Sequence, residues 1–279
     1  MKKVIFSGGL GNQMFQYAFY LFLKKKGIKA VIDNSLYSEF KMHNGFELIK
    51  VFDIKESIYR TYFLKVHLIF IKLLMKIPPV RKLSCKDDVI PIGDHEFDPP
   101  YARFYLGYWQ SKKIVNYVIE ELRAQFIFRN IPQMTIEKGD FLSSINSVSI
   151  HIRRGDYMGI PAYQGICNEI YYERAISFMK EHFLNPRFYV FSNDSIWAKL
   201  FLEKFDIDME IIVTPPIYSY WDMYLMSRCK NHIIANSTFS WWAAVLNMNK
   251  DKIVISPTIF KKDECIDIIF DDWVKISNI

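Results

Sequence analysis

Short runs of apolar residues alternate along this chain with longer segments in which apolar residues recur every three or four positions. Such short runs are typical of buried β-strands, and the longer periodicity is typical of helices that pack one face on a sheet. The expected strands cover residues 3–7, 30–33, 147–152, 187–192, 210–214, 232–235 and 253–255. The expected helices cover residues 14–23, 57–77, 112–127, 169–183, 195–204, 219–229 and 238–247.

This alternation implies parallel sheets, because two parallel strands must be joined by a crossover, usually a helix. We therefore expect an α/β protein with two Rossmann-like domains, and 279 residues suffice for both. The junction is expected near Pro132 and Gly139, which gives domains at residues 1–140 and 141–279.

Polar clusters follow four of the expected strands. They are Gly8–Gln13, His151–Asp156, Ser192–Asp194 and Asn236–Ser240. Ligands of parallel α/β sheets bind beyond the carboxyl ends of the strands. We therefore expect these clusters to converge on one cleft.

The first cluster is the glycine-rich turn Gly8-Gly9-Leu10-Gly11-Asn12. Glycines allow the backbone to approach an oxygen-rich ligand, and the start of the following helix favours negative charge. The turn is not a P-loop, and Met14 occupies the last glycine position of the GxGxxG pattern. It either contacts a phosphate or only closes a strand onto a helix.

Two adjacent arginines, Arg153 and Arg154, follow the expected strand 147–152. A buried arginine needs an anionic partner, and the guanidinium fork matches a phosphate in bidentate geometry. The position at a strand end favours phosphate binding over ion pairs at a domain interface. In a strand, His151 and Arg153 would point to one side and Arg154 to the other.

The segment Asn236-Ser237-Thr238-Phe239-Ser240 combines hydroxyl groups with backbone N–H groups at an expected helix start. This combination can bind phosphate while Asn236 or Ser237 also caps the helix. Asp194 follows another strand. Its carboxylate could accept hydrogen bonds from ribose or guanine, or it could cap the helix that starts near Ser195.

Composition limits the kinds of partner. Hydrophobic residues make up 51% of the chain and charged residues 24%, which is typical of globular proteins. The formal charge of +6 suits a phosphate-bearing substrate or an anionic membrane surface. No basic run is dense enough to indicate nucleic-acid binding.

The apolar segment 62–77 is interrupted by Lys65, His67, Lys72 and Lys76, so it does not have the pattern of a membrane span. It is either a basic amphipathic helix that rests on a membrane or a packed helix with snorkelling lysines. We favour the packed helix, because helices generally pack their apolar face.

The sequence contains neither an HExxH motif nor a Cys/His cluster, so no metal ligands are expected. Asp206-Ile207-Asp208 spells an Asp-x-Asp metal motif, but it precedes a strand, and we interpret it as a solvated turn. The four cysteines, Cys85, Cys167, Cys229 and Cys265, include no CxxC pair. Without a secretion signal, we expect reduced thiols in a cytoplasmic protein.

Taken together, these motifs resemble the α-1,2-fucosyltransferases of glycosyltransferase family 11, in the bacterial form. The resemblance spans about residues 1–260 in order, and residues 50–105 carry none of it. The matching blocks are Gly8–Ala18, Gly45–Leu48, Gly107–Ser111, His151–Tyr157, Phe191–Asp194 and Asn236–Ala244.

The resemblance implies a GT-B-like architecture, in which two Rossmann-like domains face each other. It implies GDP-β-L-fucose as donor, inversion at the anomeric carbon and no required metal. Residues 1–140 would form the acceptor side, and residues 141–279 would bind the donor.

Matched positions imply roles for individual residues. Arg153 would hold the β-phosphate, Asn12 would reach the same phosphate, and Arg154 would brace Asp156 or the domain interface. Asp194 would contact guanine or ribose. The donor-binding set is Gly11, Asn12, Arg153, Arg154, Asn193, Asp194, Ser237, Thr238 and Phe239.

Catalysis would require stabilisation of the negative charge that grows on GDP, and a general base for the acceptor hydroxyl. Arg153 serves the first purpose, and we expect Asp156, and after it His151, to serve the second. The expected acceptor is a galactose-containing oligosaccharide or a lipid-linked glycan, with transfer to its 2-hydroxyl. Peripheral contact at the inner membrane face stays open.

Alternatives from other classes also fit the same motifs. The chain could be another nucleotide-sugar glycosyltransferase, a fucosyltransferase of different linkage, or a non-catalytic binding module.

Overall fold

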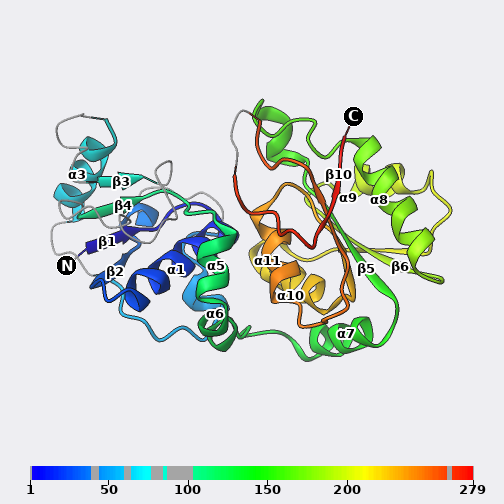
Figure 1. Cartoon of the computed structure of the whole chain (residues 1–279), viewed down its shortest axis with the longest axis horizontal. Helices are drawn as coiled ribbons and strands as arrows, with labels where there is room; N and C mark the ends of the chain where they lie inside the picture. Colours follow the sequence, from blue (N-terminus) through cyan, green and yellow to red (C-terminus); the bar gives the residue numbers. More distant parts are fainter. Residues whose placement is uncertain are drawn as a thin grey trace. The chain divides into compact units, whose positions relative to one another are not determined.

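The computed structural model describes residues 2–38, 44–59, 64–76, 84–86, 103–262 and 266–278 of the chain. The chain divides into two compact units, Met1–Arg129 and Asn130–Ile279, and each is described by itself (Figure 1). The helix α7 (Gln133–Ser144) belongs wholly to the second unit. The boundary expected at residue 140 would have cut this helix, which the sequence pattern did not predict.

The first unit contains a parallel sheet. Its described strands are β1 (Lys2–Ile5), β2 (Ala30–Asp33), β3 (Ser84–Lys86) and β4 (Phe104–Leu106). Its described helices are α1 (Leu10–Lys25), η1 (Ser35–Ser38), α2 (Leu48–Val51), α3 (Leu64–Lys76), α5 (Lys112–Tyr117) and α6 (Ile119–Gln125).

The sheet of the first unit has the strand order β2-β1-β4-β3, and each neighbouring pair is parallel. β1 pairs with β2 on one side and with β4 on the other, so it lies inside the sheet. Because β1 runs directly into the glycine turn and α1, that turn lies at the carboxyl edge of the sheet.

Some elements of the first unit differ from the sequence prediction. The helix expected at residues 57–77 begins at Leu64 in the described part, and Ile58 instead forms a bridge to Ile32. The helix expected at residues 112–127 is divided at Val118, whose φ of −119° and ψ of 19° are not helical. The three-residue strands β3 and β4 were too short to be recognised from their pattern.

The second unit contains the larger sheet. Its described strands are β5 (Ser147–Ile152), β6 (Arg187–Ser192), β7 (Met209–Ile212), β8 (Asn231–Ile233), β9 (Val254–Pro257) and β10 (Val274–Ile276). After α7, its described helices are η3 (Gly155–Gly159), α8 (Glu169–His182), α9 (Ser195–Leu202), η4 (Pro216–Tyr218), α10 (Tyr220–Arg228) and α11 (Thr238–Leu246).

The strand order of this sheet is β10-β9-β8-β5-β6-β7, and every neighbouring pair is parallel. The predicted α/β class with two parallel-sheet units is thereby confirmed. The edge strand β10 was not predicted, because its pattern Val-Lys-Ile is too short to distinguish from a loop.

The side chains of β5 alternate between the two faces of the sheet. Its even-numbered residues are apolar and lie in the hydrophobic cluster covered by α8 and α9. Its odd-numbered residues, Ser147, Ser149 and His151, face the other side. There the Ser147 hydroxyl donates to the carbonyl of Leu142 in α7 (2.6 Å), and His151 Nδ1 lies 2.8 Å from Ser240 Oγ in α11. This strand therefore has an apolar face and a polar face, and both are buried.

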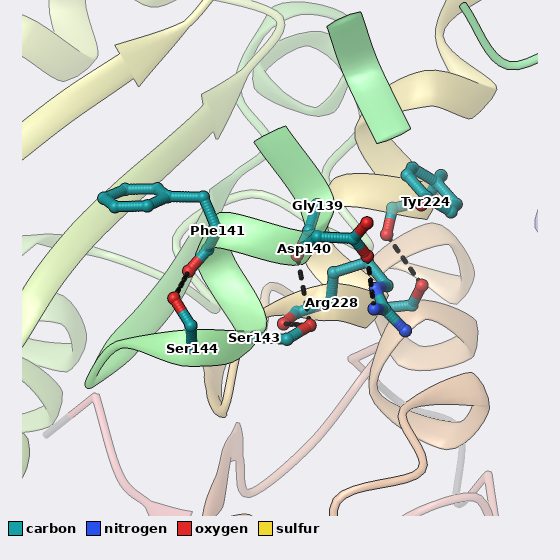
Figure 2. A network of polar contacts seen from close by, with 8 residues as sticks. Gly139, Asp140, Phe141, Ser143, Ser144, Tyr224 and Arg228 are labelled. Atoms are coloured by element: carbon teal, nitrogen blue, oxygen red, sulfur yellow. Dashed lines mark hydrogen bonds and ion pairs between the residues drawn. The ribbon is translucent and has the colours of Figure 1, made fainter. Parts of the chain in front are cut away.

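α7 and α10 approach each other closely at a glycine. A Cβ atom added to Gly139 would lie 2.9 Å from Cε1 of Tyr224 and 3.1 Å from Cγ of Arg228. Nearby, the Ser143 hydroxyl donates to the carbonyl of Arg228 (3.0 Å), and Arg228 forms an ion pair with Asp140 at 2.8 Å (Figure 2). α7 thereby fixes the position of the helix that follows β7 and η4.

Substitution Gly139→Ala tests this close approach. Alanine improves helix propensity by about 1 kcal/mol, but its methyl group overlaps the Tyr224 ring, and overpacking typically costs about 1–3 kcal/mol. We expect a net loss of roughly 1 kcal/mol in the free energy of unfolding, measured by urea denaturation. Gly159→Ala is the control, because an added Cβ there meets nothing within 4 Å. A Gly139→Ala protein as stable as the parent would contradict the described packing.

Candidate functional site

The carboxyl ends of β5, β6 and β8 lie side by side at one edge of the second sheet, because β5 pairs in parallel with both neighbours. Two tyrosines of α8 hold two of these ends. The Tyr172 hydroxyl donates to the carbonyl of His151 (3.0 Å), and the Tyr171 hydroxyl donates to the carbonyl of Ile234 (2.6 Å). The polar residues that follow the strands therefore start from fixed positions.

Arg154 follows β5 and is held by residues that follow β6. Its Cζ atom lies 3.9 Å from the ring centroid of Trp197, and its Nε atom lies 3.7 Å from Asp194 Oδ2. Its backbone N–H donates to Asn193 Oδ1 at 3.0 Å. Asp194 also caps α9, since its Oδ1 accepts from the Trp197 backbone N–H (3.2 Å). The structure thus brings Arg154, Asn193 and Asp194 together, and the described anionic partner of Arg154 is Asp194.

Arg153, which precedes Arg154 in the same turn, is half-buried. Its Cζ atom is 5.5 Å from the ring centroid of Tyr157, whose hydroxyl donates to the carbonyl of Asn236 (3.3 Å). Tyr157 therefore connects the residues after β5 with the loop that precedes α11. Asp156 belongs to η3, and its side chain lies outside the described residues.

The start of α11 combines a cap with backbone N–H groups at the carboxyl edge. The Ser237 hydroxyl accepts from the Phe239 backbone N–H (3.3 Å), and Thr238 is the first residue of the helix. Asn236 fixes the preceding loop, because its Nδ2 donates to the carbonyl of Phe260 (3.1 Å). The ring centroid of Phe239 lies 5.9 Å from that of His151. The structure therefore places Ser237, Thr238 and Phe239 beside the end of β5.

His151 is a buried residue of β5 rather than a member of the turn that follows. Burial lowers the pKa of its imidazole to about 3, and the positive charge of Arg153 acts in the same direction. The ring is therefore neutral at pH 7 and a weak proton acceptor. Its contact with Ser240 suits a residue that positions α11.

Asp222 is a candidate that the sequence analysis missed. It lies in the first turn of α10, and its Oδ1 is buried without a hydrogen-bond partner among the described residues. Burial raises the pKa of its carboxyl group from the ordinary 3.8 to about 6, although a hydrogen bond from Thr214 opposes this. Beside it, the rings of Tyr218 and Trp221 stack with centroids 4.5 Å apart. These residues also follow a strand, β7, but they form no polar cluster in the sequence, so the burial of Asp222 becomes visible only in the structure.

The glycine turn of the first unit surrounds Asn12. Gly8 has a φ of +80°, and a Cβ atom there would lie 2.8 Å from Asn12 Nδ2, so the turn requires glycine on both grounds. Asn12 Oδ1 accepts from Gln110 Nε2 at 3.0 Å. Gly11 is buried within the first turn of α1. The amide group of Asn12 is thus oriented at the carboxyl edge of the first sheet.

Gln13 in the next position has a structural role that the sequence did not reveal. It is fully buried in α1. Its Nε2 donates to the carbonyls of Gly8 (3.1 Å) and Gly45 (2.9 Å). Its Oε1 accepts from the backbone N–H groups of Glu47 (2.9 Å) and Leu48 (3.1 Å). One side chain therefore joins the glycine turn to the segment before α2.

Gln16, one helical turn later, makes a second connection and is also fully buried. Its Nε2 donates to the carbonyl of Gly107 (2.8 Å), and its Oε1 accepts from the backbone N–H of Ser7 (3.1 Å). The two glutamines bring the Gly45–Leu48 and Gly107–Ser111 blocks to the glycine turn, although these blocks are far apart in sequence.

The Asp-x-Asp sequence at Asp206 and Asp208 lies at the amino end of β7, away from the carboxyl edge. Both residues are exposed, and Asp208 Oδ2 lies 3.3 Å from Arg187 Nε. This agrees with the interpretation as a solvated turn. In the described part of the chain, no three His, Cys, Asp or Glu side chains form a group that could hold a metal ion.

Sequence comparison relates the chain to glycan-modifying enzymes. The profile described as "Glycosyl transferase family 11" matches residues 1–277. An "Alpha-1,2-colitosyltransferase" of Escherichia coli is 35% identical, with 97% of each chain covered. The "O-antigen biosynthesis glycosyltransferase WbnK" of Escherichia coli is 30% identical, with 97% of this chain and 98% of that protein covered. A "Galactoside alpha-(1,2)-fucosyltransferase 1" of Saimiri boliviensis boliviensis is 29% identical over 36% of this chain and 28% of that protein.

Structural comparison finds more distant similarities. A crystal structure of NodZ α-1,6-fucosyltransferase soaked with GDP-fucose has a TM-score of 0.48 and 15% identity, covering 88% of this chain and 92% of that chain. A crystal structure of POFUT1 in complex with GDP has a TM-score of 0.44 and 15% identity, covering 91% of this chain and 98% of that chain.

The turn after β5 depends on the absence of a side chain at Gly155, where a Cβ atom would lie 2.4 Å from Asn193 Nδ2. We expect Gly155→Ala to displace Asn193 and to weaken its hydrogen bond from the Arg154 backbone N–H. The peptide that contains Arg154 should then exchange its amide hydrogens about tenfold faster, measured by mass spectrometry. Gly159→Ala, in the same 3₁₀ segment, is the matched control. Unchanged exchange in Gly155→Ala would refute the role given to Asn193.

Proposed function

The chain belongs to glycosyltransferase family 11, and from this membership we propose that it transfers L-fucose from GDP-β-L-fucose to the 2-hydroxyl of a galactoside, with inversion and without a required metal. The observation that carries the proposal is the extent of the family match, which includes both the glycine turn and the arginine turn. The arrangement of the second unit supports it, because an arginine and a capped helix start adjoin at one sheet edge.

Transfer of fucose from GDP-fucose requires the protein to stabilise the departing diphosphate. As the glycosidic bond breaks, negative charge grows on the β-phosphate of GDP. Arg153 would bind this phosphate through its guanidinium group, and the N–H groups at the start of α11, with Ser237 and Thr238, would bind the remaining oxygens. Removing one preorganised donor of this kind typically lowers the rate by about 10²–10³-fold.

Arg154 and Asn193 would support the donor site from beside it. The ring of Trp197 and the carboxylate of Asp194 hold the Arg154 guanidinium, which favours a role in fixing the shape of the turn. Phe239 would line the nucleoside pocket next to His151.

Two carboxylates, those of Asp194 and Asp222, are candidates for the contact with guanine or ribose. Asp194 is already engaged by Arg154 and by the start of α9. Asp222 has a buried oxygen without a described partner, and a carboxylate is an acceptor-only group that suits the N–H edge of guanine. We therefore assign the contact with the guanine base to Asp222 and retain Asp194 as the alternative for this contact.

For the general base we retain Asp156, because its position in the arginine turn suits an acceptor hydroxyl. His151 is the weaker candidate, since a neutral imidazole with a pKa of about 3 takes up a proton poorly at pH 7. Gly11 and Asn12 remain proposed donor contacts of the first unit, which we assign to the acceptor side. The acceptor would be a galactose-containing oligosaccharide or a lipid-linked glycan in the cytoplasm.

A second candidate function is transfer of colitose, because a colitosyltransferase is among the relatives that align over nearly the whole chain. Colitose lacks the 3-hydroxyl of fucose. A site that hydrogen-bonds this hydroxyl would reject the deoxy sugar strongly, by up to about 10⁴–10⁵-fold, whereas a site without such a contact would use both donors.

The proposed function is tested by incubating the protein with GDP-fucose or GDP-colitose, lactose and EDTA, followed by NMR assignment of the linkage. The proposal expects an α-1,2-fucosyl product. Failure to fucosylate any of a panel of galactosides, without hydrolysis of GDP-fucose, would reject it. Preference for GDP-colitose would favour the second candidate.

Substitution of the two arginines should separate their roles. We expect Arg153→Ala to lower kcat by about 10²–10³-fold, because it removes a group that acts on the developing charge. Arg154→Lys keeps a charge near Asp194 but loses the stacked guanidinium, and it should lose much less activity. Both are measured as kcat at saturating GDP-fucose. Equal losses in the two variants would contradict the division of roles.

Asp222→Asn should separate binding from stability. The raised pKa means that the buried carboxylate destabilises the folded state as pH rises from about 4 to about 6, and this cost is fully present above pH 6. An asparagine cannot ionise. We therefore expect a gain on the order of 2 kcal/mol in unfolding free energy at pH 7.5, which shrinks at pH 4.

The same substitution should weaken GDP binding by roughly 10–100-fold, because an N–H group of guanine would lose a charged acceptor. Calorimetry with GDP measures the binding, and Asp140→Asn is the control, since Asp140 is an exposed partner of Arg228. If Asp194→Asn weakens GDP binding while Asp222→Asn does not, Asp194 is the residue that contacts guanine.

A further inference from the structure

α3 packs one of its faces on the sheet of the first unit. Leu68 and Ile71 are buried in a cluster with residues of β1, η1 and β4. His67 anchors the same face, since its Nε2 lies 2.6 Å from Oδ2 of the buried Asp33 at the end of β2. The helix is therefore fixed in orientation by apolar packing and by one buried polar contact.

The opposite face of α3 exposes large apolar side chains. Val66 is 65% exposed, Ile69 is 58% exposed and Leu73 is 38% exposed. Their spacing of three and four residues places them in one stripe along the helix. Lys65 is exposed and Lys72 is half-buried, and at 100° per residue both lie along one side of this stripe. An apolar stripe with lysines along its border is typical of helices that lie in a membrane interface.

The sequence from residue 57 to residue 86, which contains this helix, holds basic residues and no acidic ones, although acidic residues adjoin it at Glu56 and at Asp87. Residues 57–86 hold seven of the 36 Lys and Arg residues and none of the 30 Asp and Glu residues. The other 29 basic and 30 acidic residues nearly cancel, so this segment accounts for the formal charge of +6. The seven are Arg60, Lys65, Lys72, Lys76, Arg81, Lys82 and Lys86.

We infer that the exposed face of α3 is a docking surface for an anionic lipid bilayer, with Val66, Ile69 and Leu73 inserted between the headgroups and the exposed Lys65 paired with a lipid phosphate. No helix in the described part of the chain is long and apolar enough to cross a membrane, so contact through α3 would be peripheral. Apolar insertion and attraction to anionic lipids add to each other in such helices.

Charge decides between a bilayer and a second copy of this chain as the occupant. Self-association through α3 would bring together two copies of a helix whose sequence holds three lysines and no acidic residue, which is unfavourable. An anionic bilayer presents the complementary charge over a wide area. Sequence analysis alone favoured a packed helix over a membrane-resting one, and the structure shows that α3 has a packed face and an exposed apolar face together.

Co-sedimentation of the full chain with vesicles tests this surface. We expect binding to vesicles of phosphatidylcholine mixed with phosphatidylglycerol, weaker binding at high salt, and little binding to phosphatidylcholine alone. The double variant Ile69→Glu, Leu73→Glu should bind the mixed vesicles at least about tenfold more weakly, because it removes two apolar anchors and adds two negative charges.

The matched control is Ile196→Glu, Leu200→Glu, which changes two exposed apolar residues of α9, 76% and 62% exposed, in the same way. It should bind the mixed vesicles like the parent. Unchanged circular dichroism and unchanged melting temperature in both variants show that the fold is intact, whatever the enzymatic activity proves to be.

Three results would overturn the inference. The first is failure of the parent protein to sediment with the mixed vesicles. The second is binding of the α3 variant to these vesicles as tightly as the α9 variant binds them. In the third case, sedimentation velocity without lipid would show a dimer that only the α3 variant dissociates, and the face would then be an interface between copies of the chain.

Discussion

The parallel pairing of β5 with β6 and β8 is the constraint on which the second unit depends. Because all three strands run in the same direction, their carboxyl ends meet at one edge, and residues distant in sequence become neighbours there. The tyrosines of α8 then fix the last carbonyls of this region. An arginine at the end of β5 and the capped start of the helix after β8 therefore adjoin at this edge, which is where we propose that the diphosphate binds.

Buried polar groups on one side of this sheet have a cost that the apolar side avoids. His151 and Ser240 satisfy each other, whereas one oxygen of Asp222 has no described partner. An unpaired buried acceptor lowers stability. In the proposed function, an N–H group of guanine would supply the missing donor. The raised pKa of Asp222 has the same cause as the loss of stability, because burial disfavours the ionised carboxylate.

Much of the architecture follows from local pattern, and the failures have physical causes. The alternation in Ser147–Ile152 predicted β5 and its two faces, and Asp194 and Ser237 proved to be helix caps as their positions after strands indicated. β10 and β4 are three residues long and are specified by pairing rather than by pattern. Likewise, Asp222 stands out only through its burial, which the sequence does not state, and Gln13 resembles any polar residue of a helix until its four partners are known.

Gln13 and Gln16 link the glycine turn to two segments that are distant from it in sequence, Gly45–Leu48 and Gly107–Ser111. A shorter side chain at position 13 would remove the Gln13 partner from the carbonyl of Gly45 and from the backbone N–H groups of Glu47 and Leu48. The carbonyl of Gly8 would keep the Tyr37 hydroxyl as its donor. As long as Gln13 is present, the loop from Gly45 to Leu48 can change its path only together with α1. Across related chains, insertions or deletions in that loop should therefore be accompanied by replacement of the glutamine, and drift at either place alone should be rare.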